Sequence, residues 1–213
     1  HPKVFDSHPP TALSQPAFLK AVIEKTQAFP HFQVELGVTV SELLCANGRV
    51  EGVTVRSQTG RKALYSDLVV GADGRNSVIR RACDLDVRKH GIDFDVVWFK
   101  MPLPVFSGGQ TSFQFYVGRG HLLIAYPAAN GLLQVGWIIT KGTYGELRRR
   151  GISEWVEEMA QYATPALGAH LRIHSRSLTN PFLLSTVSDR VTSWSAPGAL
   201  VIGDAAHTMS PVG

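Results

Sequence analysis

The sequence contains only two cysteines in its 213 residues, Cys45 and Cys83, and they lie far apart along the chain. They form neither a CxxC motif nor a Cys and His pattern with metal-ligand spacing, so we expect no metal site. Free thiols in a reducing cytoplasm are the simpler interpretation, and a disulfide is the alternative. We therefore expect a cytoplasmic protein rather than a disulfide-stabilised secreted domain.

Long hydrophobic runs are also absent. No segment approaches the roughly 18 consecutive apolar residues that a membrane-spanning helix needs. The opening HPKVFDSHPP has no apolar stretch of the kind that a signal peptide carries. With 44% hydrophobic and 18% charged residues, the chain has the balance of a globular protein. We expect no membrane span.

The net charge is +4, with basic clusters at Arg80-Arg81, residues 88–90 and residues 148–150. None of these clusters is interleaved with stacking aromatic residues in a nucleic-acid-binding motif. Solvent-exposed faces are the simplest interpretation, and attraction of an anionic cofactor or substrate is the second. We expect a small-molecule partner and no nucleic acid, while nothing in the sequence specifies an oligomeric state.

The first third of the chain predicts a helix followed by a small meander. Ser14 is a suitable N-cap, and apolar residues then recur at helical spacing until Pro30. Asn47-Gly48 lies between two strand-like segments and favours a tight hairpin, because both residues accept positive φ. A third short strand is expected at 62–65, and a short basic helix at 77–82.

The middle of the chain predicts an antiparallel sheet followed by two helices. Strands are expected at 95–101, 111–117, 122–127 and 132–140, helices at 154–162 and after Thr164-Pro165, and a last strand at about 183–194. In the second strand, Phe113, Phe115 and Val117 share one face. The fold class is therefore α/β in the mixed α+β sense.

Two loops have one form, an apolar strand followed by glycine, aspartate and small residues: LVVGADG and LVIGDAA. Ligands bind at the carboxyl ends of strands in layered α/β domains, and glycine allows a close approach of the backbone. A strand-end aspartate can accept hydrogen bonds from sugar hydroxyls. Taken singly, Asp73-Gly74 is a common turn and His207 is a typical structural histidine. Taken together, the loops favour a hydroxyl-rich anionic ligand such as a dinucleotide.

Both loops lie in longer motifs. DGRNSVIR, from Asp73 to Arg80, resembles the DGxxSxxR motif of flavoprotein aromatic hydroxylases with the p-hydroxybenzoate hydroxylase fold. GDAAHTMSPVG, from Gly203 to Gly213, resembles their second flavin motif, GDAAHxxPPxG. SQPAFLKAV, from Ser14, resembles the helix before the meander in the phenol and phenylpropionate hydroxylase branch. The resemblance covers nearly the whole chain as the middle of a longer protein.

This resemblance implies cofactor-binding roles for five motif residues. Asp204, which follows Gly203, corresponds to the aspartate that binds the ribitol chain of FAD. Asp73, Gly74 and Arg80 correspond to the motif between the FAD pyrophosphate and the nicotinamide route.

Three further positions follow from the same resemblance. Pro211 corresponds to the proline beside the isoalloxazine ring, and Gly213 to the start of a helix that faces the flavin. Gln15 matches a family position near the cofactor. One departure is Ser210, which stands where the family usually has the first of two prolines.

The resemblance also implies a reaction. The family uses NAD(P)H to reduce FAD and inserts one oxygen atom into an aromatic or other electron-rich substrate, with the cofactor performing the difficult step. A flavin reductase or dehydrogenase on the same fold is the first alternative, and a truncated, non-catalytic binding module is the second. A flavin halogenase is disfavoured, because the sequence has no WxWxIP string.

The resemblance predicts two domains. Residues 1–92 and 186–213 are expected to form an incomplete, Rossmann-like FAD-binding domain, and residues 93–185 a substrate domain built on the antiparallel sheet. The sheet face with Phe113, Phe115 and Trp137 is a candidate lining of a substrate pocket, with plain core packing as the simpler interpretation. No GxGxxG opens the chain, and the nearest string, GRGHLL at Gly118, fails at its last position. We therefore expect the sequence to be a fragment of a longer protein and to be inactive alone.

Overall fold

The computed structural model describes residues 13–104, 113–118, 120–178 and 181–209, which fold as two compact units. One unit joins the residues up to Phe32 with Asp93–Ser185, and the other joins Gln33–Ile92 with the segment that starts at Thr186. Residues up to Phe32, which we expected in the FAD-binding part, thus group with the sheet-bearing segment. The assignment of the two units as FAD-binding and substrate domains stays a prediction.

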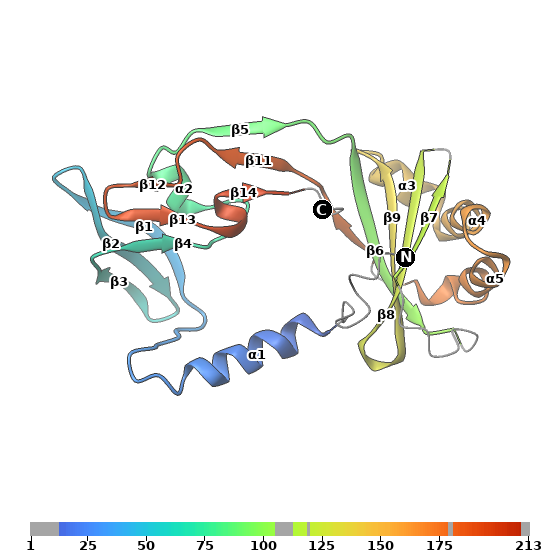
Figure 1. Ribbon diagram of the computed structural model, residues 1–213, viewed down its shortest axis with the longest axis horizontal. Helices are drawn as coiled ribbons and strands as arrows, with labels where there is room; N and C mark the ends of the chain where they lie inside the picture. Colours follow the sequence, from blue (N-terminus) through green and yellow to red (C-terminus); the bar gives the residue numbers. More distant parts are fainter. Residues whose placement is uncertain (1–12, 105–112, 119, 179–180, 210–213) are drawn as a thin grey trace, which may run out of the picture. The chain divides into compact units, whose positions relative to one another are not determined.

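The second unit begins with the expected meander (Figure 1). Strands β1 (Thr39–Ala46), β2 (Arg49–Ser57) and β3 (Gly60–Tyr65) form an antiparallel sheet in the order β1-β2-β3. Asn47 and Gly48 join the first two strands with φ values of 51° and 72°. This pair of positive φ values confirms the hairpin that the dipeptide predicts.

A short parallel pairing forms the centre of this unit. Strand β4 (Val69–Gly71) runs parallel to β13 (Ala199–Val201), whose other edge pairs with β12 (Ser195–Ala196). Helix α2 (Val78–Ala82) follows β4. Buried apolar side chains from these elements form the core of the unit: Val50, Val69, Ile79, Val191, Ala199, Val201, Ala205 and Ala206.

A third small sheet has the order β14-β11-β5. Its strands are β5 (Val87–His90), β11 (Ser188–Val191) and β14 (His207–Thr208), and both pairings are antiparallel. We interpreted the Arg88-Lys89-His90 cluster as a solvated face without predicting a strand. Its three residues are exposed, so β5 lacks the apolar alternation by which a strand is recognised.

The first unit is built on a five-stranded antiparallel sheet with the order β10-β6-β9-β8-β7. The strands are β6 (Phe94–Pro102), β7 (Gln114–Gly118), β8 (His121–Ala128), β9 (Leu132–Thr140) and β10 (Phe182–Leu184). A 3-10 turn, η3 (Ala129–Gly131), joins β8 to β9. Gly118 pairs with His121 across the β7–β8 hairpin, so the GRGHLL string forms a hairpin end rather than a phosphate-binding loop.

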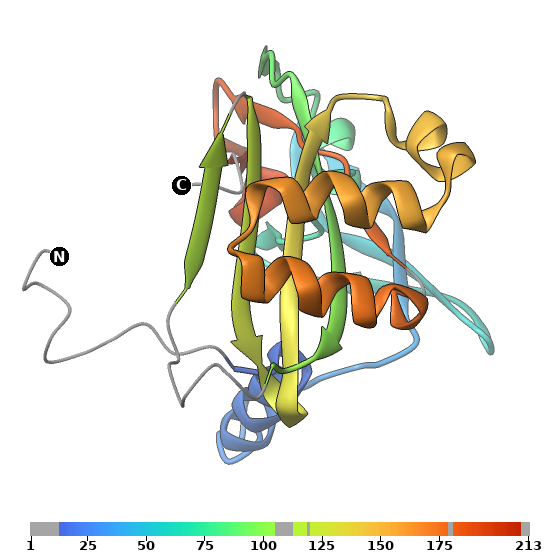
Figure 2. The same cartoon turned by 90° about the vertical axis from the view of Figure 1, so that its right-hand side faces the viewer.

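Helices cover one face of this sheet (Figure 2). They are α3 (Tyr144–Arg150), α4 (Ile152–Tyr162) and α5 (Pro165–Ile173), followed by a 3-10 turn, η4 (Ser175–Ser177). Helix α5 starts at Pro165, as predicted, and the side chain of Thr164 caps it by accepting a hydrogen bond from the backbone N–H of Leu167. Helix α3 was not predicted, because its one buried residue, Leu147, gives no apolar periodicity.

The single strand predicted at about 183–194 is wrong. The structure has two strands there, β10 in the five-stranded sheet of the first unit and β11 in the three-stranded sheet of the second. The chain passes from one unit to the other between Ser185 and Thr186. The apolar pattern is interrupted at this crossing by Ser185 and Thr186.

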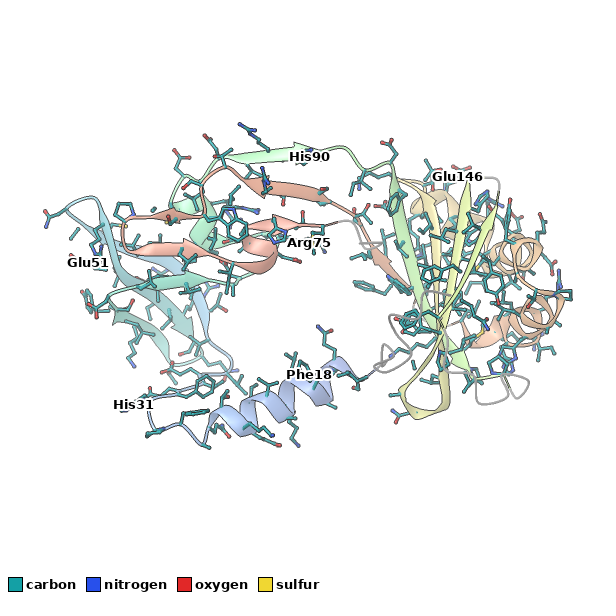
Figure 3. The ribbon with its side chains drawn as sticks, viewed as in Figure 1. Phe18, His31, Glu51, Arg75, His90 and Glu146 are labelled. Carbon is teal, nitrogen blue, oxygen red and sulfur yellow. The ribbon has the colours of Figure 1, made fainter. Side chains whose placement is uncertain are left out.

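Helix α1 (Gln15–Thr26) has no buried residue, and Phe18, Leu19 and Val22 on its predicted apolar face are exposed (Figure 3). Cys45 and Cys83 are free thiols, as predicted. In the part of the chain that the structure describes, no helix is long and apolar enough to cross a membrane. The fold is mixed α/β, as the sequence predicted.

Candidate flavin site

The two aspartate loops leave the same edge of one sheet. Strands β4 and β13 are parallel, with Val201 opposite Gly71, and the backbone N–H of Ile202 donates to Gly71 O at 2.9 Å. Asp73 follows the end of β4 by two residues, and Asp204 follows the end of β13 by three. Since carboxyl ends of parallel strands meet at one edge, the fold brings both predicted motifs together.

The Gly203-Asp204 loop presents an available acceptor. Gly203 has φ 58°, and a Cβ added there would meet no described atom within 4 Å. Asp204 lies on the 3-10 turn η5 (Gly203–Ala205) and is exposed. Among the described residues, its carboxylate has no hydrogen-bond or ion-pair partner. Ala205 and Ala206 behind it are fully buried, so the turn is anchored while the carboxylate faces outward.

Asp73 is engaged within its own loop instead. Its Oδ2 atom accepts hydrogen bonds from the backbone N–H groups of Val78 at 2.6 Å and Ile79 at 3.3 Å. Partial burial opposes ionisation, but hydrogen bonds from Ser77 and from these N–H groups lower the pKa of Asp73 below its usual value. The carboxylate therefore caps helix α2, and Gly74, with φ 77°, turns the chain between them.

Arg80 connects the two loops from the interior of the unit. Its guanidinium is buried, and Nη1 donates to the carbonyl oxygen of Ala205 at 3.2 Å. The Nη2 atom donates to the carbonyl oxygen of Arg75, the residue after Gly74. Arg80 thus contacts the backbone of both motifs and lies in the interior rather than on the ligand-facing surface.

The other cofactor candidates lie outside the described part of this unit. Gln15 is the first residue of α1, in the other unit. Pro211 and Gly213 lie outside the described residues. The described candidate site consists of Asp73, Gly74, Arg80, Gly203 and Asp204.

Phe115 lies on the sheet face opposite the helices, in a row of cross-strand neighbours. The row consists of Phe182, Trp98, Gly136, Ile124 and Phe115, one residue from each strand. A Cβ added to Gly136 would lie 2.6 Å from the Trp98 ring, so the indole packs flat over the glycine. The exposed fraction of the Phe115 side chain is 59%.

Phe113 extends this aromatic face. Its ring stacks on Tyr126 with centroids 4.3 Å apart, and Tyr126 meets Trp98 edge to face at 6.2 Å. Partial burial raises the pKa of the Tyr126 phenol. Phe113 is 43% exposed. We call Trp98, Phe113, Phe115, Tyr126 and Phe182 the open aromatic face.

Trp137 does not belong to the open aromatic face, so the expected grouping with Phe113 and Phe115 is wrong. It is one residue along β9 from Gly136 and therefore points to the helix-covered side. It is 1% exposed and packs in the core with Leu147, Trp155 and other buried residues. His121 stacks on its ring at 5.1 Å, and both border a cavity of about 200 Å³ on this side of the sheet.

A family model described as an FAD binding domain matches residues 4–213, which is nearly the whole chain. The chain belongs to this FAD-binding family. The match includes both aspartate loops, in agreement with the flavoprotein motifs recognised in the sequence. FAD is therefore the ligand class to which the family assigns this domain.

Known relatives of the family include monooxygenases. The 6-methylpretetramide 4-monooxygenase of Streptomyces rimosus is 30% identical over 203 residues, which cover 95% of this chain and 47% of the relative. A probable FAD-dependent monooxygenase from Pseudomonas aeruginosa has a similar structure, with TM-score 0.75 and 16% identity over 92% of this chain and 53% of that one. The chain thus spans about half the length of these relatives.

A myxobacterial FAD-dependent halogenase, CndH, is also similar, with TM-score 0.75 and 17% identity over 94% of this chain and 47% of that one. At this identity the likeness shows the fold alone. The same fold therefore accompanies different chemistries among the family's structural neighbours.

Sequence reasoning missed one residue that contacts both motifs. Asp189, on β11, lies outside both motifs, yet its carboxylate is buried between Arg80 and Thr208. Its neighbours in the sequence, Ser188 and Arg190, carry no family pattern that we recognised. A buried aspartate in a short polar strand becomes visible only when its partners, distant in sequence, are placed around it.

Proposed function

We propose that the full-length protein is an FAD-dependent monooxygenase that takes reducing equivalents from NAD(P)H. It inserts one atom of molecular oxygen into an aromatic or other apolar small molecule. The observation that carries this proposal is the meeting of both flavoprotein motif loops at one sheet edge. The family match and the monooxygenase activity named for its curated relative support the same reaction class.

The described residues suit a flavin dinucleotide. Asp204 offers a free, exposed carboxylate beside the open space over Gly203, which fits the hydroxyl-rich ribitol chain. Asp73 and Gly74 shape the second loop, and Arg80 holds the two loops together from the interior. When bound, FAD supplies the transfer of a hydride from NAD(P)H and the activation of oxygen. The chain's own residues bind and orient it.

The open aromatic face supports an aromatic or apolar substrate. Phe113 and Phe115 are exposed side chains on the sheet face opposite the one that α3, α4 and α5 cover. Aromatic rings bind planar apolar molecules by stacking and by burial of apolar area. The curated relative acts, by its name, on 6-methylpretetramide, which makes that compound a reasonable first probe.

The test uses the purified full-length protein. Retained FAD is measured from the visible spectrum, and oxidation of NADH and of NADPH is followed with and without 6-methylpretetramide. Products formed under 18O-labelled oxygen are analysed by mass spectrometry. We expect retained FAD, substrate-stimulated NAD(P)H oxidation and one labelled oxygen atom in the product, given a suitable substrate.

Other outcomes separate the alternatives. Flavin-dependent turnover of NAD(P)H with no label in any product, across a panel of polycyclic phenols, would indicate a reductase or dehydrogenase. Failure to retain FAD or to oxidise NAD(P)H would indicate a non-catalytic module. Comparison of Phe115→Ala with the parent then tests the open aromatic face, because loss of a stacking ring should raise KM for the substrate and leave FAD content unchanged.

A further inference from the structure

A buried polar network joins the two motif loops through Asp189. Its Oδ2 atom lies 3.8 Å from Nη1 of Arg80, and the two side chains are only 8% and 10% exposed. Its Oδ1 atom accepts hydrogen bonds from Oγ1 and the backbone N–H of Thr208, at 2.7 Å and 3.3 Å. The backbone N–H of Asp189 donates to Thr208 Oγ1 at 2.9 Å. Asp189 is thus tied to Thr208 at three points.

Each end of this network reaches one motif. Thr208 lies in the GDAAHT segment, and Arg80 ends the DGRNSVIR segment. The Arg80 guanidinium contacts the carbonyls of Arg75, in the first loop, and Ala205, in the second. The first loop, the buried aspartate and the second loop therefore form one continuous set of polar contacts.

A buried ion pair contributes little net stability, because desolvation of the two charges offsets their attraction. What such a network does provide is a defined geometry, since each partner must occupy one position to be satisfied. The spacing of the two loops needs such support, because β4 and β13, which carry the loops, are each only three residues long. Small shifts between such short strands would move Asp204 relative to the loop of Asp73.

We propose that Asp189 is a positioning residue for the flavin. Through Arg80 and Thr208 it holds the two motif loops at the spacing at which both contact FAD. This inference rests on the proposed FAD site and adds a residue that lies outside the motifs. Asp189 is itself buried, so it acts only through its partners.

The first test is Asp189→Asn in the full-length protein, with Asp95→Asn as a matched control. Asp95 is also buried, pairs with Lys141 at 3.1 Å and accepts from the backbone N–H of Gly142, but it lies in the other unit. Both changes should lower the melting temperature. Measured well below those temperatures, the Kd for FAD should rise about tenfold or more for Asp189→Asn and change by less than about twofold for Asp95→Asn.

A second pair of variants avoids the removal of a charge. Thr208→Val has nearly the same volume but loses the hydroxyl bonded to Asp189, whereas Thr208→Ser keeps it. We expect Thr208→Val to raise the Kd for FAD and Thr208→Ser to keep it near the parent value. A merely structural role would give parent-like FAD affinity in every folded variant.

The outcomes separate this inference from the proposed function. If Asp189→Asn and Thr208→Val fold and bind FAD as the parent does, the positioning role is overturned while the monooxygenase proposal stands. If the parent binds FAD and the variants lose affinity as expected, but no oxygen is inserted into any substrate, the positioning role holds and the proposed monooxygenase reaction is wrong. A full-length parent that binds no FAD would overturn both.

Discussion

At the scale of single residues, two aspartates in similar loops have different environments. Asp73 accepts two backbone hydrogen bonds that begin helix α2. Asp204 is exposed and has no protein partner among the described residues. The same residue type thus shapes the protein in one loop and remains available to a ligand in the other.

Replacement of Asp204 by alanine should weaken FAD binding by roughly 1.5–3 kcal/mol, the usual contribution of a charge-assisted hydrogen bond. Isothermal titration of the full-length protein measures this change. Asp67→Ala is the control, because Asp67 is also exposed but precedes β4 at the opposite edge of the sheet. Equal FAD affinity of the Asp204 variant and the parent would contradict the assignment.

Asp73 should make the stability of its unit depend on pH in the acid range. Because the folded pKa is lowered, ionised Asp73 stabilises the folded state above its unfolded pKa of about 4. This stabilisation is lost as the pH falls through the folded pKa. The difference in melting temperature between the parent and Asp73→Asn should therefore be largest near neutral pH and shrink below about pH 4. A difference that stays constant from pH 7 to pH 3 would show that capping of α2 by Asp73 does not depend on the charge of its carboxylate.

At the scale of elements, the five-stranded sheet has two aromatic faces with different roles. Trp137→Ala should lower the free energy of unfolding by roughly 3–5 kcal/mol, since the ring fills a buried core position. Phe115→Ala, on the open face, should lower it far less, because that ring is already 59% exposed. Thermal and urea unfolding of the two variants test this contrast. A normal melting temperature for Trp137→Ala with altered coupling of NAD(P)H oxidation to product would instead make Trp137 a pocket residue.

At the scale of the whole molecule, the 213 residues contain no GxGxxG string. A dinucleotide pyrophosphate is usually held by the N–H groups of a glycine-rich turn and the helix that follows. We therefore expect the isolated chain to bind FAD more weakly than about 1 μM, equivalent to −8 kcal/mol, even when the full-length protein binds it tightly. Flavin fluorescence on addition of FAD to the chain measures this. Micromolar or tighter binding would show that the described loops suffice, or that a second copy completes the site.

Local chemistry explains what could be predicted from the sequence. The hairpin at Asn47-Gly48 and the start of α5 after Thr164 depend on neighbouring residues alone, and both were predicted. The two aspartate loops were recognised because a strand, a glycine and an aspartate are adjacent in each. In these cases the preferred φ values and the side-chain acceptors act within a few residues.

The tertiary structure decided what depends on distant partners. Alternation shows that a strand has two faces, but it does not show which face the helices cover, so Trp137 and Phe115 were wrongly grouped. The sequence near residue 185 did not reveal that the chain changes sheets there. Asp189 gained a role only when folding placed it against Arg80 and Thr208. The sequence by itself thus determined most of the elements and the flavin motifs, because these arise from short-range preferences. The spacing between the motifs was decided by a buried network whose members are far apart in the chain.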